Sequence, residues 1–213
     1  MDGVLIDSVK YHWQAMNEVP AEYGIHVPDE PLLGYIGRPL RSQLKQLGNE
    51  NGVEFDYDTF SERIAALKQV SLANIQSKEG VVQLLELLKS NNISIAVATS
   101  NPKDETQRRL VDARIVDYFN VLVTEDDVTE HKPSPAVYFE AARQINANSL
   151  DCILFEDAPA GVQAAKNADM TCIAVRTPFT IVSDLEAADV IVSYLAEADM
   201  NLMNNIINKE MAD

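Results

Sequence analysis

Two acidic clusters in the sequence have the residue types of a metal site. Asp2 lies in the segment Asp2-Gly3-Val4-Leu5, and Glu156 and Asp157 form an adjacent acidic pair. Carboxylate oxygens are the ligands that a hard cation such as Mg²⁺ prefers in proteins. These three side chains are therefore the candidate ligands of a bound Mg²⁺.

Two further segments are suited to an anion. Thr99-Ser100-Asn101 follows an apolar run and leads into a helix-like stretch. Hydroxyls and backbone N–H groups in such a place can hold an anion. Lys132 opens another helix-like stretch, and a lysine aimed at the same point neutralises charge on a transferring phosphoryl group. Together with the acidic residues, these segments predict metal-assisted phosphoryl transfer.

Each segment has a structural explanation when it stands alone. An Asp-Gly pair usually forms a turn, a Thr-Ser-Asn-Pro run is typical of a helix start, and adjacent acids or a single lysine are usually solvated. The hypothesis depends on their joint placement. Three of the segments fall at the carboxyl end of a predicted strand, where ligands bind in open α/β sheets.

The second half of the chain alternates apolar strands with helices. We expect helices over residues 80–89, 136–145 and 160–168, and strands over residues 93–98, 121–123, 152–155, 171–175 and 190–192. Strands that are apolar on both faces are typical of a parallel sheet covered by helices on both sides. The fold class is therefore α/β.

The first third has a different pattern, in which helix-like segments dominate. Apolar residues recur there at helical spacing, as in Leu40, Leu44 and Leu47, and in Phe60, Ile64 and Leu67. We expect an all-helical cap over residues 10–76, inserted into an α/β core formed by residues 1–9 and 77–213.

The ordered set of polar segments resembles the haloacid dehalogenase superfamily of phosphotransferases, in the subgroup with a helical cap after the first motif. Asp2-Gly3-Val4-Leu5 is similar to the end of the first motif, Ser100 to the second-motif hydroxyl, Lys132 to the third motif and Glu156-Asp157 to the fourth. The resemblance extends from Met1 to about Phe179. It implies a Rossmann-like core, a Mg²⁺ cofactor and a phosphate-monoester substrate.

The chain departs from the family pattern at its first residue. The nucleophilic aspartate of the family lies two positions before the residue that matches Asp2, and Met1 occupies the intervening position. The strand that carries this aspartate is normally central in the sheet, so its loss leaves a gap in the core and unpaired backbone on its neighbours. We expect a longer natural form to carry the strand and the aspartate. Asp7 lies beyond the turn, and we expect it to order the loop or cap the following helix.

The resemblance also implies a role for each residue. The aspartate before Met1 attacks phosphorus to form an aspartyl-phosphate, and Asp2 acts as the general acid and base. The backbone carbonyl of Asp2 and the side chains of Asp157 and Glu156 hold the metal. The phosphoryl oxygens are held by Ser100, Asn101 and Lys132. Without the nucleophile we expect the 213-residue chain to have little or no turnover.

The cap supplies candidates for substrate recognition. His12, in Tyr11-His12-Trp13-Gln14-Ala15, resembles a histidine that faces the active site in β-phosphoglucomutases, although packing or surface histidines are as common. Arg38 and Arg41 lie in a segment similar to that of phosphoglycolate phosphatases. Either arginine can hold an anionic or polyhydroxyl group, or simply be solvated.

Composition limits the partners. The chain has 17 Lys plus Arg against 33 Asp plus Glu, a net charge of −16, which argues against nucleic acid and anionic lipid as partners. No apolar stretch reaches the ~18 residues that a membrane span requires, and the first residues lack the basic run of a secretory signal. We expect a cytoplasmic monomer that acts on a small phosphorylated metabolite.

Three functions remain open at this point. The leading one is a Mg²⁺-dependent phosphatase that hydrolyses a small phosphate monoester, most plainly a sugar phosphate. A phosphomutase of the β-phosphoglucomutase kind differs only in passing the phosphoryl group to a substrate hydroxyl rather than to water. A catalytically inactive truncated homologue is the third.

Overall fold

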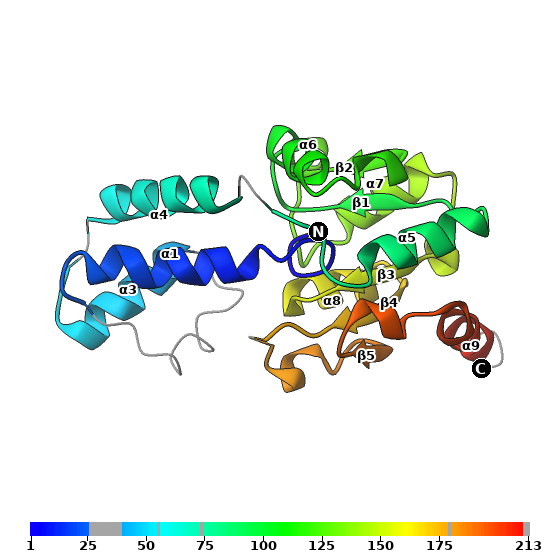
Figure 1. The fold of residues 1–213 in the computed structure, drawn as a ribbon. Helices are drawn as coiled ribbons and strands as arrows, with labels where there is room; N and C mark the ends of the chain where they lie inside the picture. Colours follow the sequence, from blue (N-terminus) through cyan, green and yellow to red (C-terminus); the bar gives the residue numbers. More distant parts are fainter. Residues whose placement is uncertain (26–39, 55, 73–74, 179, 211–213) are drawn as a thin grey trace. The chain divides into compact units, whose positions relative to one another are not determined.

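The computed structural model describes residues 1–25, 40–54, 56–72, 75–178 and 180–210. The chain divides into two compact units (Figure 1). Ser8–Ile75 forms the helical unit, whereas Met1–Asp7 and Gln76–Asp213 together form the α/β unit. The helical unit is therefore an insertion between two parts of the α/β unit.

The helical unit is built from amphipathic helices. Its described helices are α1 (Val9–Ala21), α3 (Leu40–Asn51) and α4 (Tyr57–Leu72). Helix α4 packs against both α1 and α3. The apolar side chains between them are buried, among them Trp13, Met16, Leu44, Leu47, Phe60 and Ile64. The predicted all-helical character of this segment is confirmed in the residues that the structure describes.

The α/β unit alternates helices and strands along the chain. The strands are β1 (Ala96–Ala98), β2 (Val121–Val123), β3 (Ile153–Glu156), β4 (Thr171–Val175) and β5 (Val190–Val192). The helices are α5 (Val81–Ser90), α6 (Lys103–Asp112), α7 (Ala136–Gln144), α8 (Pro159–Asn167) and α9 (Met200–Glu210). Every strand pair is parallel. The α/β class expected from the sequence is therefore confirmed.

The predicted strand over residues 93–98 is shorter than expected. Only Ala96–Ala98 forms β1, because these residues are the ones that pair with the three residues of β2. Ile93 is 40% exposed, so it lies outside the part of the sheet that is covered.

No helix among the described residues has both the length and the apolar character that crossing a bilayer demands.

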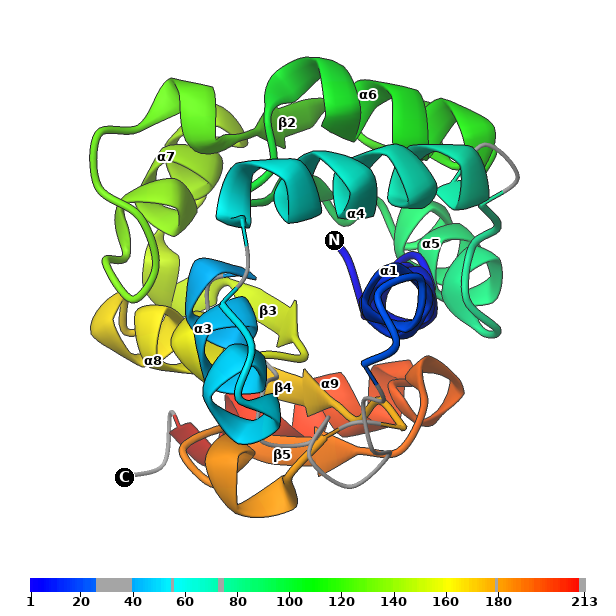
Figure 2. The same ribbon diagram turned by 90° about the vertical axis from the view of Figure 1, so that its left-hand side faces the viewer.

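The single sheet expected from the sequence is present in two pieces. One has the order β1-β2, and the other has the order β3-β4-β5, whose strands lie side by side in Figures 1 and 2. An apolar cavity of about 560 Å³ is lined by β1, by β3, by helices α5 and α7, and by Met1, Val4 and Leu5. We call this cavity the sheet slot. It confirms the expected gap in the core.

Candidate active site

Residues 1–7 form a tight loop. The N–H of Gly3 donates to the Ile6 carbonyl at 2.9 Å, and the N–H of Leu5 donates to the Met1 carbonyl at 2.8 Å. Gly3 has a φ of +67°, and a Cβ at this position would collide with the carboxylate of Asp157. Glycine is therefore required both by the backbone conformation and by the close approach of Asp157.

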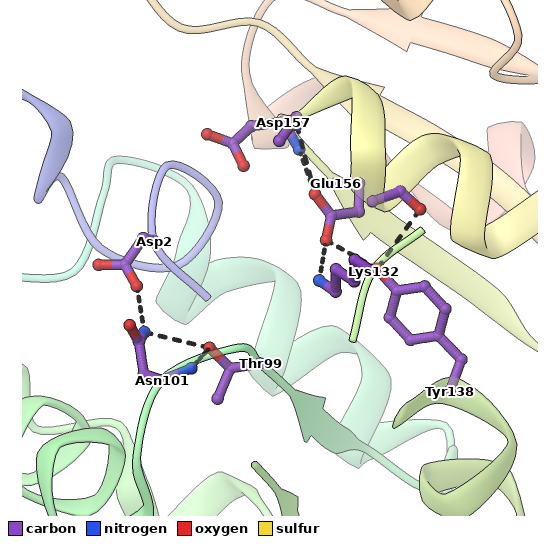
Figure 3. A network of polar contacts seen from close by, with 9 residues as sticks. Asp2, Thr99, Asn101, Lys132, Tyr138, Glu156 and Asp157 are labelled. Atoms are coloured by element: carbon purple, nitrogen blue, oxygen red, sulfur yellow. Dashed lines mark hydrogen bonds and ion pairs between the residues drawn. The ribbon is translucent and has the colours of Figure 1, made fainter. Parts of the chain in front are cut away.

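Asp2 is held by two residues that follow β1. The Asn101 Nδ2 donates to Asp2 Oδ2 at 2.5 Å (Figure 3). Nη1 of Arg109 donates to Asp2 Oδ1 at 2.7 Å. Arg109 is 4% exposed and also donates to Glu105 on its own helix. Asn101 is in turn oriented by Thr99, whose Oγ1 accepts from its side chain at 3.1 Å. Both carboxylate oxygens of Asp2 are therefore fixed.

Glu156 is the centre of a second network at the end of β3 (Figure 3). Its Oε1 accepts from Lys132 Nζ at 2.5 Å and from the Tyr138 hydroxyl at 2.8 Å. Its Oε2 accepts from the backbone N–H groups of Asp157 and Ala158 at 3.1 and 3.3 Å. Burial by itself raises the pKa of this carboxyl. The Lys132 ammonium and the hydrogen bonds lower the pKa by more than burial raises it, so that the resulting value is about 2. Glu156 is therefore a carboxylate at neutral pH.

Asp157 has the opposite electrostatic environment. Burial and the neighbouring Glu156 carboxylate raise the pKa of Asp157 to about 7. The Nζ of Lys78 donates to the Gly3 carbonyl, and its positive charge partly offsets this rise. Among the described residues, the Asp157 carboxylate has no hydrogen-bond donor. A cation that approaches this carboxyl group favours its ionised form.

The donor chemistry fits Mg²⁺ at Asp157 better than at Glu156. The Glu156 carboxylate accepts from Lys132, Tyr138 and two backbone N–H groups, whereas the Asp157 carboxylate accepts no hydrogen bond within the part of the chain that the structure describes. Within the described ranges no group of three His, Cys, Asp or Glu side chains is arranged to hold a metal. Mg²⁺ commonly takes only one or two protein carboxylates and keeps several waters, so one free carboxylate is a suitable starting point.

The structure brings most of the predicted residues together. Asp2 and Asn101 share one network, Lys132 and Glu156 share the other, and Asp157 contacts the loop between them through Gly3. Ser100 differs, because it is exposed, whereas its neighbour Thr99 is 4% exposed and hydrogen-bonded.

The cap candidates lie in the helical unit or outside the described residues. His12 belongs to α1 and Arg41 to α3, and the side chains of both are outside the description. Arg38 lies wholly outside the described residues. Their predicted role in substrate recognition stays a prediction.

Two residues of the networks were not predicted as site residues. Arg109 belongs to the buried face of α6 together with Thr106 and Leu110. A charged residue on the apolar face of a predicted helix could have indicated that it pairs with a buried acid. Tyr138 lies in the buried stripe of α7, where an aromatic residue is ordinarily read as core. Its hydroxyl could be assigned to Glu156 only from the structure.

The family model for haloacid dehalogenase-like hydrolases matches residues 1–175. The match covers most of the chain and contains both networks, so the chain belongs to this family of hydrolases.

Individual relatives are similar over most of their length. A phosphorylated carbohydrates phosphatase of Thermotoga maritima is 32% identical over 169 residues, covering 79% of this chain and 78% of the relative. A validoxylamine A 7'-phosphate phosphatase of Streptomyces hygroscopicus subsp. limoneus is 30% identical, covering 95% and 90%. Among solved structures, a candidate beta-phosphoglucomutase from Thermotoga maritima is 29% identical, with a TM-score of 0.79 over 96% of each chain.

Proposed function

We propose that the chain is the body of a Mg²⁺-dependent phosphatase that hydrolyses a small phosphate monoester of the sugar-phosphate class through an aspartyl-phosphate. The observation that carries the proposal is the fixed carboxylate of Asp2. The next residue, Gly3, lies against the carboxylate of Asp157. The names of the relatives, which include a phosphorylated carbohydrates phosphatase, support the substrate class.

In this proposal Asp2 is the general acid and base. It protonates the leaving oxygen and then takes a proton from the attacking water. Arg109 and Asn101 restrict its carboxylate to one orientation. A catalytic group that is already held in the reactive orientation lowers the activation barrier. The nucleophile is an aspartate two positions before Asp2, on an apolar segment that precedes Met1.

The remaining residues bind the phosphoryl group and the metal. Lys132 has three donor hydrogens, of which Glu156 uses one, so it retains donors for a phosphoryl oxygen. Ser100 and Asn101 supply further donors after β1. Mg²⁺, when bound, neutralises charge on the phosphoryl oxygens. Asp157 and the backbone carbonyl of Asp2 would hold it, while Glu156 orients Lys132 and the N–H of Asp157.

The test uses three matched proteins. One is the 213-residue chain, one carries an apolar strand segment ending in aspartate immediately before Met1, and one carries the same segment ending in asparagine. Phosphate release from a panel of sugar phosphates is measured with Mg²⁺ and with EDTA. We expect turnover only from the aspartate extension with Mg²⁺, and its loss by at least about 100-fold in Asp2→Asn.

Two results would contradict the proposal. Equal turnover from the chain with and without the aspartate extension would remove the assigned nucleophile. Absence of turnover from all three proteins, each shown to be folded, would favour the inactive homologue.

A phosphomutase is the second candidate, because the similar solved structure from Thermotoga maritima bears a beta-phosphoglucomutase name. An isomerisation assay with β-glucose 1-phosphate, run beside the phosphate-release assay, separates the two reactions. Alanine substitutions at His12, Arg38 and Arg41 then test the cap candidates, since a substrate contact raises KM for one substrate more than for another.

A further inference from the structure

Lys78 lies in the short segment that leads from the helical unit back into the α/β unit. Its backbone N–H donates to the Leu5 carbonyl at 2.9 Å, and the preceding residue, Ser77, forms an antiparallel bridge with Ile6. The backbone by itself therefore joins this segment to the loop of residues 1–7. The side chain of Lys78 takes no part in that pairing and makes a separate contact.

The separate contact is with Gly3. The Lys78 side chain is partly buried, and its Nζ donates to the carbonyl of Gly3, the residue that lies against the Asp157 carboxylate. Taking an ammonium group out of water is costly unless other groups compensate the charge. Burial lowers the pKa of Lys78, and the nearby carboxylates of Asp157 and Asp7 partly offset this effect. These two carboxylates therefore compensate the burial of the ammonium.

Each of the three acids predicted for the site has a basic side chain near it. The three combinations, with the acid named first, are Asp2 with Arg109, Glu156 with Lys132, and Asp157 with Lys78. In the first two, the basic group is in direct contact with the carboxylate. Lys78 differs, because within the described residues it makes no ion pair with Asp157 and its Nζ is bonded to Gly3 instead. The Asp157 carboxylate therefore has a counter-charge that does not occupy its oxygens.

We propose that Lys78 is a positioning residue of the candidate site, which holds the loop of residues 1–7 against Asp157 and supplies a counter-charge to this carboxylate without blocking it. This role rests on the proposed function, in which Asp157 and the Asp2 carbonyl hold Mg²⁺. Because Gly3 follows Asp2 directly, a displaced Gly3 carbonyl also moves the backbone of Asp2. Lys78 acts on catalysis through these two acids and not through contact with substrate.

A role confined to closing the loop predicts a different behaviour. Backbone hydrogen bonds from Gly3 to Ile6 and from Leu5 to Met1 already close the loop, and the backbone N–H of Lys78 adds another. A neutral side chain at position 78 would then serve as well as lysine. Because we assign the role to the charge, we expect arginine to replace lysine and methionine to fail.

The first test does not require activity. Thermal unfolding of the 213-residue chain is compared with that of Lys78→Met, Asp157→Asn and the double variant, with EDTA, at pH 8, where Asp157 is mostly ionised. All four proteins keep the amino group of Met1, which also favours ionised Asp157. We expect Lys78→Met to lower the midpoint by roughly 4 °C. At least half of that loss should disappear in the Asp157→Asn background, since the charge that Lys78 compensates is absent there.

Amide hydrogen exchange of the same proteins locates the effect. Exchange in residues 3–6 should become at least about tenfold faster in Lys78→Met, while exchange in β4 stays the same. Lys89→Met is the matched control, because Lys89 is an exposed lysine on α5. Its midpoint should stay within about 1 °C of the parent chain, and its exchange in residues 3–6 should be unchanged.

The second test is kinetic and uses the protein with the aspartate extension, in the presence of Mg²⁺. We expect Lys78→Met to lower kcat by at least about tenfold, because the acids of the site are misplaced. KM should change by less than about twofold, because Lys78 does not contact substrate. Lys78→Arg, which keeps the charge and the N–H donors, should restore kcat to within about threefold of the parent.

Each result supports or overturns the role of Lys78. Equal midpoint losses from Lys78→Met in the two backgrounds, unchanged exchange in residues 3–6, or an unchanged kcat would overturn it. A higher KM with an unchanged kcat would also overturn it, because that result indicates contact with substrate. Absence of turnover from the extended parent would contradict the proposed function alone, and the midpoints and exchange rates would still decide the role of Lys78.

Discussion

Replacing Lys132 by methionine removes a partly buried positive charge and keeps an unbranched side chain of similar length. The side chains of Lys132 and Glu156 are 14% and 7% exposed, and Nζ lies 2.5 Å from Oε1. Removing one partner of such a pair typically costs about 3–5 kcal/mol. Because Glu156 keeps the Tyr138 hydroxyl and two backbone N–H donors, we expect the lower end of that range, about 3 kcal/mol at pH 7.

The loss should depend on pH with a definite sign. The native pKa of Glu156 is about 2, below its ordinary value of 4.5. A lowered native pKa contributes stability that is present above the ordinary value and is lost as the pH falls toward 2. Without Lys132, burial dominates and raises this pKa, so the variant gains relative stability when Glu156 is protonated. The difference between the two proteins should therefore narrow by at least about 1.4 kcal/mol between pH 7 and pH 4.5, the equivalent of one pKa unit.

The assay is urea unfolding followed by far-ultraviolet circular dichroism, with EDTA present. Lys166→Met is the matched control, because Lys166 pairs with Asp189 at 2.7 Å while its side chain is 33% exposed. A pair that solvent reaches contributes about 1 kcal/mol or less. Equal losses in the two variants, or a loss in Lys132→Met that is the same at both pH values, would refute this account of the Glu156 network.

Three further predictions concern stability. Arg109 is 4% exposed and donates to Asp2 and to a second acid; Arg109→Met should cost about 3 kcal/mol in urea unfolding, and Arg109→Lys should recover only part of it because lysine lacks the planar fork. In Gly161→Ala the new methyl group meets the Glu156 carboxylate, so calorimetry should show a loss of about 1–3 kcal/mol, and an unchanged midpoint would contradict this contact. Asp127 accepts two hydrogen bonds from the threonine three positions earlier, which lower its pKa; Asp127→Ala should cost about 1 kcal/mol at pH 7, a difference that disappears as the pH falls through the lowered pKa.

Sequence patterns predicted most of the fold because they are local. A run of apolar residues such as 171–175 forms a strand buried along its whole length, and the stripe Val81, Leu84, Leu85 and Leu88 forms the buried face of α5. The same patterns overestimated β1, since the extent of a strand also depends on its partner, and β2 has only three residues to offer.

The candidate site was predictable in its acids and lysine but not in how they are held. Polar segments at strand ends are visible in the sequence, and they predicted Asp2, Asn101, Glu156 and Asp157 as site residues, whereas Lys132 was predicted from its place at the start of a helix. The protonation states of the acids could not be predicted from the sequence. Glu156 and Asp157 are adjacent acids, yet one has its pKa lowered by Lys132 and the other has its pKa raised by burial.

The sequence by itself determined the α/β class, the helical insertion, the polar segments at the strand ends and the expectation of a gap in the core. Only the tertiary structure decided that Arg109 holds Asp2 across 107 positions of the chain, that Tyr138 shares Glu156 with Lys132, and that the gap is a slot bordered by two strand edges. The physical reason is the range of the interactions. Apolar periodicity and the polar residues that follow strands depend on a few neighbouring residues. Ion pairs, burial and sheet edges arise between segments that meet only when the chain folds.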